Sequence, residues 1–202
     1  TYNYRKALLN FNGRMGNVLD LDELANEMLP SLGKALDITQ AKLLFPDTDS
    51  GDFTTQFVYP TAKEELSDEL RLNPTNPIVA WLAKEGKPLS SEQIDNLPEF
   101  KGLWKVEREN LTASGLSLLF PIRGRDELIG ILALGEKKSG KLYSHEDIDL
   151  AMSIANQAGI IIENAQLYTQ ATIRANTDGL TGLYNHRHFH ERLEQEIARG
   201  SR

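Results

Sequence analysis

The sequence contains no cysteine among its 202 residues. Without thiols the chain cannot form disulfides, bind zinc or an iron–sulfur cluster through thiolates, attach a bilin through a thioether, or use a cysteine nucleophile. Histidine is scarce as well, with four residues, and none falls in a segment that we expect to form a core. A haem with an axial histidine is therefore not expected inside the fold. We expect this chain to bind no cofactor and no metal.

Long apolar runs and an excess of positive charge are also missing. The longest apolar stretches are LIGILAL and AGIII, whereas a membrane-spanning helix needs about 18 residues or more. Acidic residues outnumber basic ones by 29 to 22, so the net charge is -7 and phosphate backbones are repelled. We expect no nucleic-acid partner, no membrane span, no signal peptide and a cytoplasmic location.

What the sequence does contain is the composition of a globular protein. Hydrophobic residues make up 40% and charged residues 25% of the chain, which is typical of a soluble domain that buries a core. The length suits one domain with appendages and is too short for two full domains.

Helical periodicity marks the beginning of the chain. Residues 1–18 carry an apolar stripe at alternating steps of four and three, formed by Tyr4, Leu8, Phe11 and Met15. This stripe fits a helix packed on its own domain and equally one packed on a second chain. A second helix is expected from Asp22 to about Leu36.

The period then changes to that of strands. The segments QAKLLFPD and DFTTQFVY predict a hairpin around the turn residues DTDSGD. A short helix is expected after Asn76 as its N-cap, with Pro77 at the first position and Gly86 just past the end. The segment SLLFPIRGRDELIGILALGEK predicts two further strands, and their continuous apolarity indicates that they are covered on both faces.

A long helix follows, announced by Ser144 and Asp147 as a variant of the capping box. From Ile148 to Ile162 it is apolar almost all the way round, so we expect it to be covered on more than one side. One side would lie on the sheet and the other on the N-terminal helix or a second copy of the chain. The residues that we expect on this dimer and relay surface of the long helix are Ile154, Ala158, Ile161 and Ala165.

The order of these elements resembles the GAF family of small-molecule sensor domains over about residues 19–168. The family commonly has a proline in one strand, a glycine in the return strand and an aromatic residue before a Ser/Thr-x-x-Asp helix start. The matching positions here are Pro121, Gly130, Tyr143, Ser144 and Asp147. The resemblance implies an α/β (α+β) fold, in which helices flank a mostly antiparallel central sheet and long helices stand at both ends.

After a connector helix at residues 169–177, the stretch DGLTGLYNHRHF resembles the opening of a GGDEF domain, the catalytic domain of diguanylate cyclases. The matching residues are Asp178, Leu180, Thr181, Gly182, Leu183, Asn185 and Arg187, while His186 replaces the usual arginine. The resemblance implies a parent enzyme that uses magnesium and GTP. Residues 178–202 are too few for a catalytic domain, so we expect no cyclase activity from this chain.

A ligand pocket is expected between the sheet and the covering segment of residues 78–114. Its candidate residues are Phe57, Tyr59, Trp81, Phe100, Trp104 and Arg108, the last as a partner for an anion. The alternative is that these aromatic residues only fill the core. His186 and His190 have the spacing of metal ligands on a helix, but no third ligand accompanies them.

These observations predict a cytoplasmic regulatory domain that forms a homodimer and controls a diguanylate cyclase. Two interpretations stay open: a sensor gated by an unknown small molecule, and a dimerisation scaffold without a ligand that sets the spacing of two cyclase domains.

Overall fold

A computed structural model of the chain describes residues 21–60, 70–103, 105–176, 181, 183 and 185–200. The predicted helix of residues 1–18, with Tyr4, Leu8, Phe11 and Met15, lies outside them, as does Trp104.

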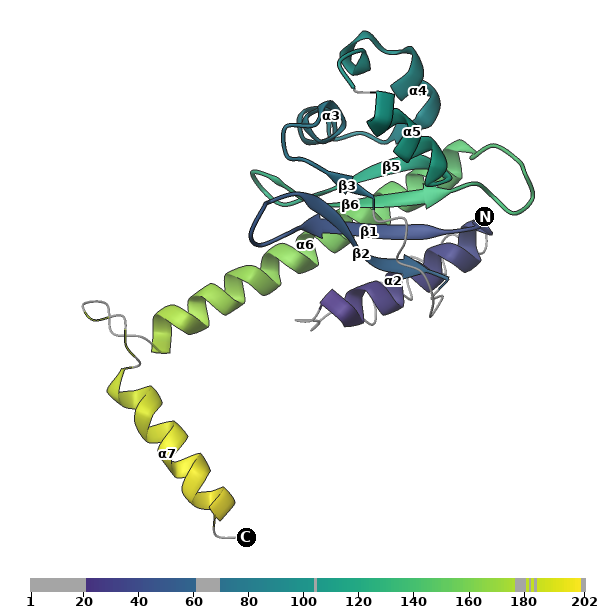
Figure 1. Cartoon of the computed structure of the whole chain (residues 1–202). Helices are drawn as coiled ribbons and strands as arrows, with labels where there is room; N and C mark the ends of the chain where they lie inside the picture. Colours follow the sequence, from purple (N-terminus) through teal and green to yellow (C-terminus); the bar gives the residue numbers. More distant parts are fainter. Residues whose placement is uncertain are drawn as a thin grey trace. The chain divides into compact units, whose positions relative to one another are not determined.

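A six-stranded sheet with the order β3-β2-β1-β6-β5-β4 forms the centre of the first part of the chain (Figure 1). Every pairing in it is antiparallel. The strands are β1 (Ala41–Pro46), β2 (Phe53–Tyr59), β3 (Arg71–Leu72), β4 (Leu89–Ser90), β5 (Leu116–Arg123) and β6 (Leu128–Gly135). Both predicted hairpins and the predicted α/β fold class are confirmed.

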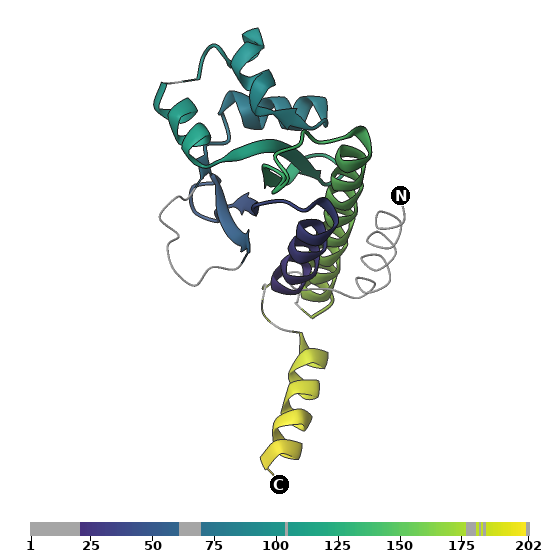
Figure 2. The same ribbon diagram turned by 90° about the vertical axis from the view of Figure 1, so that its right-hand side faces the viewer.

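Helices cover both faces of this sheet (Figures 1 and 2). On one side lie α2 (Leu21–Leu36) and the first part of α6 (His145–Asn176), and we call this side the α2/α6 face. The opposite side, the α3–α5 face, is covered by α3 (Pro77–Glu85), α4 (Ser91–Asn96), the 3-10 turn η1 (Pro98–Phe100) and α5 (Lys105–Ala113). Because β1, β5 and β6 are covered on both sides, nearly all their residues are buried, as their apolarity predicts.

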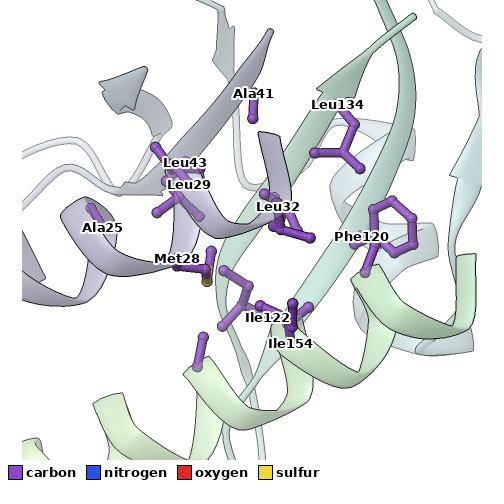
Figure 3. Packing of buried hydrophobic residues seen from close by; sticks show 14 of the residues in the cluster. Ala25, Met28, Leu29, Leu32, Ala41, Leu43, Phe120, Ile122, Leu134 and Ile154 are labelled. Carbon is purple, nitrogen blue, oxygen red and sulfur yellow. The ribbon is translucent and has the colours of Figure 1, made fainter. Parts of the chain in front are cut away.

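The larger apolar cluster fills the α2/α6 face. Met28 and Leu32 of α2, Ile122 of β5 and Ile154 of α6 all belong to it, and Figure 3 shows them pointing into the space between the two helices and the sheet. Burial of such side chains contributes about 1.5–3 kcal/mol each. The position of α6 up to Ile162 is therefore fixed mainly by apolar packing.

The helix ends follow the chemistry that the sequence predicts. The Asn76 side chain accepts a hydrogen bond from the Ile78 N–H, and Gly86 ends α3 in the left-handed conformation with φ 61°. At the start of α6, the Ser144 N–H donates to the Asp147 carboxylate at 2.8 Å, and the Asp147 N–H donates to the Ser144 hydroxyl at 3.2 Å. The predicted capping box is confirmed.

A β-bulge interrupts the pairing of β1 with β2. Leu43 pairs with Phe57 and Leu44 with Thr55, so Gln56 is an extra residue without a partner position. Side chains alternate between the faces of a sheet, so one extra residue transfers every later side chain of the strand to the opposite face. Phe53 accordingly belongs to the cluster on the α3–α5 face, whereas Phe57 packs against the cluster on the α2/α6 face.

Residues 163–202 form a second unit. Within the described residues this unit contains the end of α6 and helix α7 (His186–Gly200). No helix in the described part of the chain is long and apolar enough to cross a membrane.

Candidate ligand face and signalling helix

The sheet separates the aromatic residues that the sequence groups into one pocket. Trp81 and Phe100 lie on the α3–α5 face, whereas Phe57 and Tyr59 pack against the cluster on the α2/α6 face. The prediction of a single pocket containing both pairs is therefore wrong. The cause is the bulge at Gln56, which a pattern of alternating residues does not reveal.

Tyr59 serves as a packing contact for α2. A Cβ atom added to Gly33 would lie 2.1 Å from Cε1 of the Tyr59 ring, so the glycine leaves the space that this ring occupies. Phe57 forms an edge-to-face pair with Phe45, with ring centroids 6.2 Å apart. Tyr59 therefore packs β2 against α2, and Phe57 packs β2 against β1, both on the α2/α6 face.

On the α3–α5 face, Trp81 of α3 and Phe100 of η1 form a tilted aromatic pair with centroids 6.3 Å apart. Phe100 is fully buried, and Trp81 is half-buried. Of the two aromatic candidates described on this face, Trp81 is thus the one that solvent, and hence a ligand, reaches.

Arg108 is engaged by its own chain. Its guanidinium donates hydrogen bonds to the carbonyl oxygens of Ile94 in α4 and Phe100 in η1, and it lies 3.5 Å from the Asp95 carboxylate. These contacts tie α5 to the two elements before it. The structure therefore gives Arg108 a structural role within its own chain, and the contact with an anion stays a prediction.

A second polar link joins α3 to α5. The Asn76 side chain, which caps α3, also donates a hydrogen bond from Nδ2 to the Glu107 carboxylate at 3.1 Å. Asn76 is buried, so this contact replaces water. The sequence identifies the cap but not its partner 31 residues away.

Lys42 is a buried cation that the sequence analysis does not select. It pairs across the sheet with Ala133, which belongs to the α3–α5 cluster, and its neighbours Ala41 and Leu43 belong to the opposite cluster. Lys42 therefore points to the α3–α5 face, where 8% of its surface stays exposed. The signal in the sequence is a lysine inside the apolar run QAKLLFP, since a charged residue in a strand covered on both faces is rare.

Thr55 adds a second buried polar group on the same face. It pairs with Leu44 of the α3–α5 cluster, and its hydroxyl donates to the Leu70 carbonyl oxygen at 3.4 Å. An anchoring ammonium, a hydroxyl and a half-buried indole are the kinds of groups that orient small ligands on an apolar surface. Lys42, Thr55 and Trp81 are therefore the candidate ligand-contacting residues of this face.

A polar cluster fixes the beginning of α6 to the end of β6. The Lys137 ammonium donates to the Asp147 carboxylate at 2.7 Å, and both side chains are 18% exposed. Burial would raise the pKa of Asp147, but hydrogen bonds from Lys137 and Ser144 and the charge of Lys137 together lower it. The Tyr143 hydroxyl donates to the Gly135 carbonyl oxygen, and burial together with the charge of Asp147 raises the pKa of Tyr143.

The residues predicted for the dimer and relay surface of α6 occupy different surroundings. Ile154 and Ala158 are fully buried in the α2/α6 cluster of their own chain, so they cannot meet a second copy. Ile161 is half-buried against the same cluster, and Ala165 is partly buried. The outward apolar residue in this stretch is Ile160, with 53% of its surface exposed.

The GGDEF-like segment is described in part. Asp178, Leu180 and Gly182 lie outside the described residues, and so does the Arg187 side chain. The Leu183 N–H donates to the Thr181 hydroxyl, and the Asn185 carbonyl accepts from Phe189 N–H, so Asn185 holds the N-cap position of α7. Along α7, Phe189, Leu193 and Ile197 recur every four residues and are exposed.

Within the residues that the structure describes, no group of three or more His, Asp or Glu side chains is arranged to hold a metal ion. His145, in the first turn of α6, is exposed.

Comparison with known proteins agrees with this architecture. The sequence profile of the GAF domain matches residues 18–163. The structure is similar to that of the GAF domain/HD domain protein from Geobacter sulfurreducens, with a TM-score of 0.60 and 18% identity over 76% of this chain and 99% of that chain.

Two further structures are similar. The GAF domain of a phosphoenolpyruvate-protein phosphotransferase from Coxiella burnetii has a TM-score of 0.61 and 17% identity, over 84% of this chain and 98% of that one. The GAF domain of a two-component sensor histidine kinase from Bacillus halodurans has a TM-score of 0.55 and 19% identity, over 76% of this chain and 100% of that one. At these identities the likeness concerns the fold.

Proposed function

The chain belongs to the GAF domain family, and from that premise we propose that it is a regulatory domain whose α3–α5 face binds a small anionic molecule. The observation that carries this proposal is the buried Lys42, placed on the same face as Thr55 and the half-buried Trp81. A buried ammonium attracts an anion more strongly than an exposed one because water screens it less. Lys42 already interacts within the chain, so an anion would share or displace that contact.

Differential scanning of this chain with a panel of carboxylates, phosphates and nucleotides tests the ligand. A ligand present at 100 times its Kd adds about 2.7 kcal/mol of stability, which raises the unfolding midpoint by several degrees. We expect Lys42→Met, which removes the charge and keeps the length, to abolish the shift. Lys34→Met, at an exposed position of α2, should leave it intact; loss of the shift in both variants would contradict the role of Lys42.

A second candidate function is a dimerisation scaffold without a ligand. It is favoured by the complete burial of Phe100, Ile131 and Ala133, whose side chains fill the α3–α5 face from within the chain. In that case no compound of the panel raises the unfolding midpoint, while the chain still forms a dimer.

We further propose that the output is a diguanylate cyclase domain beginning at residue 178. Support comes from the GGDEF-like residues around Thr181 and Asn185, and from the exposed stripe of Phe189, Leu193 and Ile197 on α7. Such a stripe is typical of a helix that packs on a further layer. In this proposal the chain is cytoplasmic and dimeric, and its helices set the approach of two GTP-binding domains that use magnesium.

A chimera tests the output: a GGDEF catalytic domain is joined in register with the segment beginning at residue 178, and cyclic di-GMP formation is measured. Two residues inserted between Asn164 and Ala165 turn the following helix by about 200°, whereas seven residues turn it by about 700°, close to two full turns. We expect the first insertion to change cyclase activity and the second to preserve it. Equal activity in both would contradict control through α6.

A further inference from the structure

The last residue of β5, Arg123, contacts both helical layers. Its backbone faces α6 at Gly159, where an added Cβ would lie 2.2 Å from the Arg123 carbonyl oxygen and 3.1 Å from its carbonyl carbon. Non-bonded atoms do not approach so closely. Helix α6 therefore lies directly on the backbone of residue 123, with no side chain between them.

The side chain of Arg123 extends to the other layer. Its Nη1 atom lies 2.5 Å from the position that a Cβ of Gly86 would occupy. Gly86 is the left-handed residue that ends α3, and its N–H donates to the Leu82 carbonyl at 3.1 Å. The last carbonyl groups of a helix carry partial negative charge, so the guanidinium is electrostatically complementary to the end of α3.

The end of β5 is also irregularly paired. Ile122 pairs with Gly130 and Arg123 with Leu128, so Ile129 is an extra residue in β6. Beyond it the turn is closed by a hydrogen bond from the Gly124 N–H to the Glu127 carbonyl at 2.9 Å. Bulges bend a strand and interrupt its ladder locally, so this strand end is less constrained than the centre of the sheet.

We propose that Arg123 couples the end of α3 to the middle of α6. A shift of the last turn of α3 displaces the guanidinium packed over Gly86, and with it the backbone of residue 123. Because the contact of that backbone with Gly159 has no side chain that could rotate away, α6 moves with it. This coupling deepens the proposed function, since it connects the proposed ligand face to the proposed output helix.

Hydrogen exchange of the free chain, followed by mass spectrometry, tests the coupling. In Arg123→Ala we expect amide exchange to accelerate on the order of threefold or more in residues 82–87 and in residues 155–162. Lys87→Ala removes an exposed positive charge beside the same helix end and should change neither segment. Residues 24–32 of α2, which share the α2/α6 face, serve as an internal reference and should keep their rate.

Faster exchange at the end of α3 without any change in α6 would overturn the coupling, as would no change in either segment. An equal acceleration in α2 would also overturn it, because Arg123 would then stabilise the whole fold in a general way.

A second pair of variants addresses the direction of the coupling. Gly86→Ala strains the left-handed end of α3 and brings its methyl group against the guanidinium. We expect it to accelerate exchange in residues 155–162 of the parent chain and to add nothing there in the Arg123→Ala background. An equal effect in both backgrounds would contradict the proposal. These measurements need neither a ligand nor a cyclase, so their failure is distinguishable from failure of the ligand panel.

Discussion

Single residues at the start of α6 determine how firmly this helix is attached to the sheet. Asp147 accepts hydrogen bonds from the Lys137 ammonium and the Ser144 N–H in a site where both charged side chains are largely buried. Charge-assisted hydrogen bonds of this kind are stronger than those between neutral groups. Apolar packing fixes most of α6, and the attachment of its first turn should depend in addition on the ionisation of one carboxyl group.

We expect Asp147→Asn to lower the free energy of unfolding by about 1.5–3 kcal/mol at neutral pH. The pKa of Asp147 is lowered in the folded chain, so the ionised form stabilises the fold. This contribution is complete well above the unfolded pKa of about 3.9 and is lost as the pH falls towards the folded value. Urea denaturation between pH 7 and pH 3 should show the variant approaching the parent chain.

The neighbouring exposed acid provides the control for this prediction. Glu146→Gln, in the same helical turn, should change the free energy of unfolding by less than about 0.5 kcal/mol. A difference between Asp147→Asn and the parent that stays constant from pH 7 to pH 3 would contradict the assignment.

A glycine sets the distance between α6 and β5. In Gly159→Ala the overlap with the Arg123 carbonyl should cost about 3 kcal/mol through overpacking, against about 1 kcal/mol gained in helix propensity. We expect a net loss of about 2 kcal/mol, measured by thermal and chemical denaturation. Gly102→Ala, where no heavy atom lies within 4 Å of the added Cβ, should leave the stability unchanged, and an equal loss there would contradict the packing argument.

The residues that sequence alone assigns correctly are those governed by local chemistry. Asn76 and Gly86 act as caps, and Ser144 with Asp147 forms a capping box, because each role depends on neighbours within four positions. Glu107 escapes sequence analysis because its partner Asn76 lies 31 residues away in the chain. The sequence shows Lys42 inside an apolar run, but the face to which it points depends on the distant strand β6.

At the scale of elements, the packing of α2 on β2 depends on one glycine and one ring. The Tyr59 side chain occupies the space beside Gly33 that a methyl group would fill. Since a glycine inside a helix is unfavourable by about 1 kcal/mol relative to alanine, its presence in α2 is explained by this contact.

We expect Gly33→Ala to destabilise the chain by about 1–2 kcal/mol, because the Tyr59 ring must shift. In a Tyr59→Ala background the same substitution should instead stabilise by about 1 kcal/mol, since only the helix propensity then changes. A double-mutant cycle measured by urea denaturation gives the coupling energy directly. Identical effects of Gly33→Ala in both backgrounds would show that the ring and the helix are not coupled.

The sequence predicts where helices and strands lie along the chain better than it predicts which side of the sheet their side chains occupy. Periods and turn residues predict the helices from Asp22 and from Ser144 and both hairpins, because these patterns repeat over many residues. The distribution of Phe57 and Tyr59 was not predictable, since the bulge at Gln56 depends on how two strands pair. Ile154 and Ala158 likewise lie in the core of their own chain and not on the predicted dimer surface, because a helix that is apolar nearly all round does not show which side faces the sheet.

At the scale of the whole molecule, the proposed homodimer needs apolar surface that the chain leaves uncovered. Ile160 is the outward apolar residue in the buried stretch of α6 and is 53% exposed. Ile160 directly follows Gly159, which lies on the Arg123 backbone. A contact between two copies at Ile160 would therefore lie beside the proposed coupling through Arg123.

We expect Ile160→Glu to weaken self-association at least about tenfold, because it places a charge in an apolar contact. Leu142→Glu introduces the same charge at an apolar residue that is 93% exposed outside α6, and it should leave association unchanged. Light scattering and sedimentation over a range of concentrations measure both variants. A parent chain that stays monomeric at high concentration would contradict the dimer.

The extra residue in β2 has a consequence for how the length of this hairpin can vary. Gln56 is exposed, so replacing its side chain should be harmless. Deleting it would make Phe57 the neighbour of Thr55, which already points to the opposite face of the sheet. The ladder with β1 would then be continuous, and Phe57 and Tyr59 would keep their places on the α2/α6 face, so the strand can lose a residue here without reversing its faces.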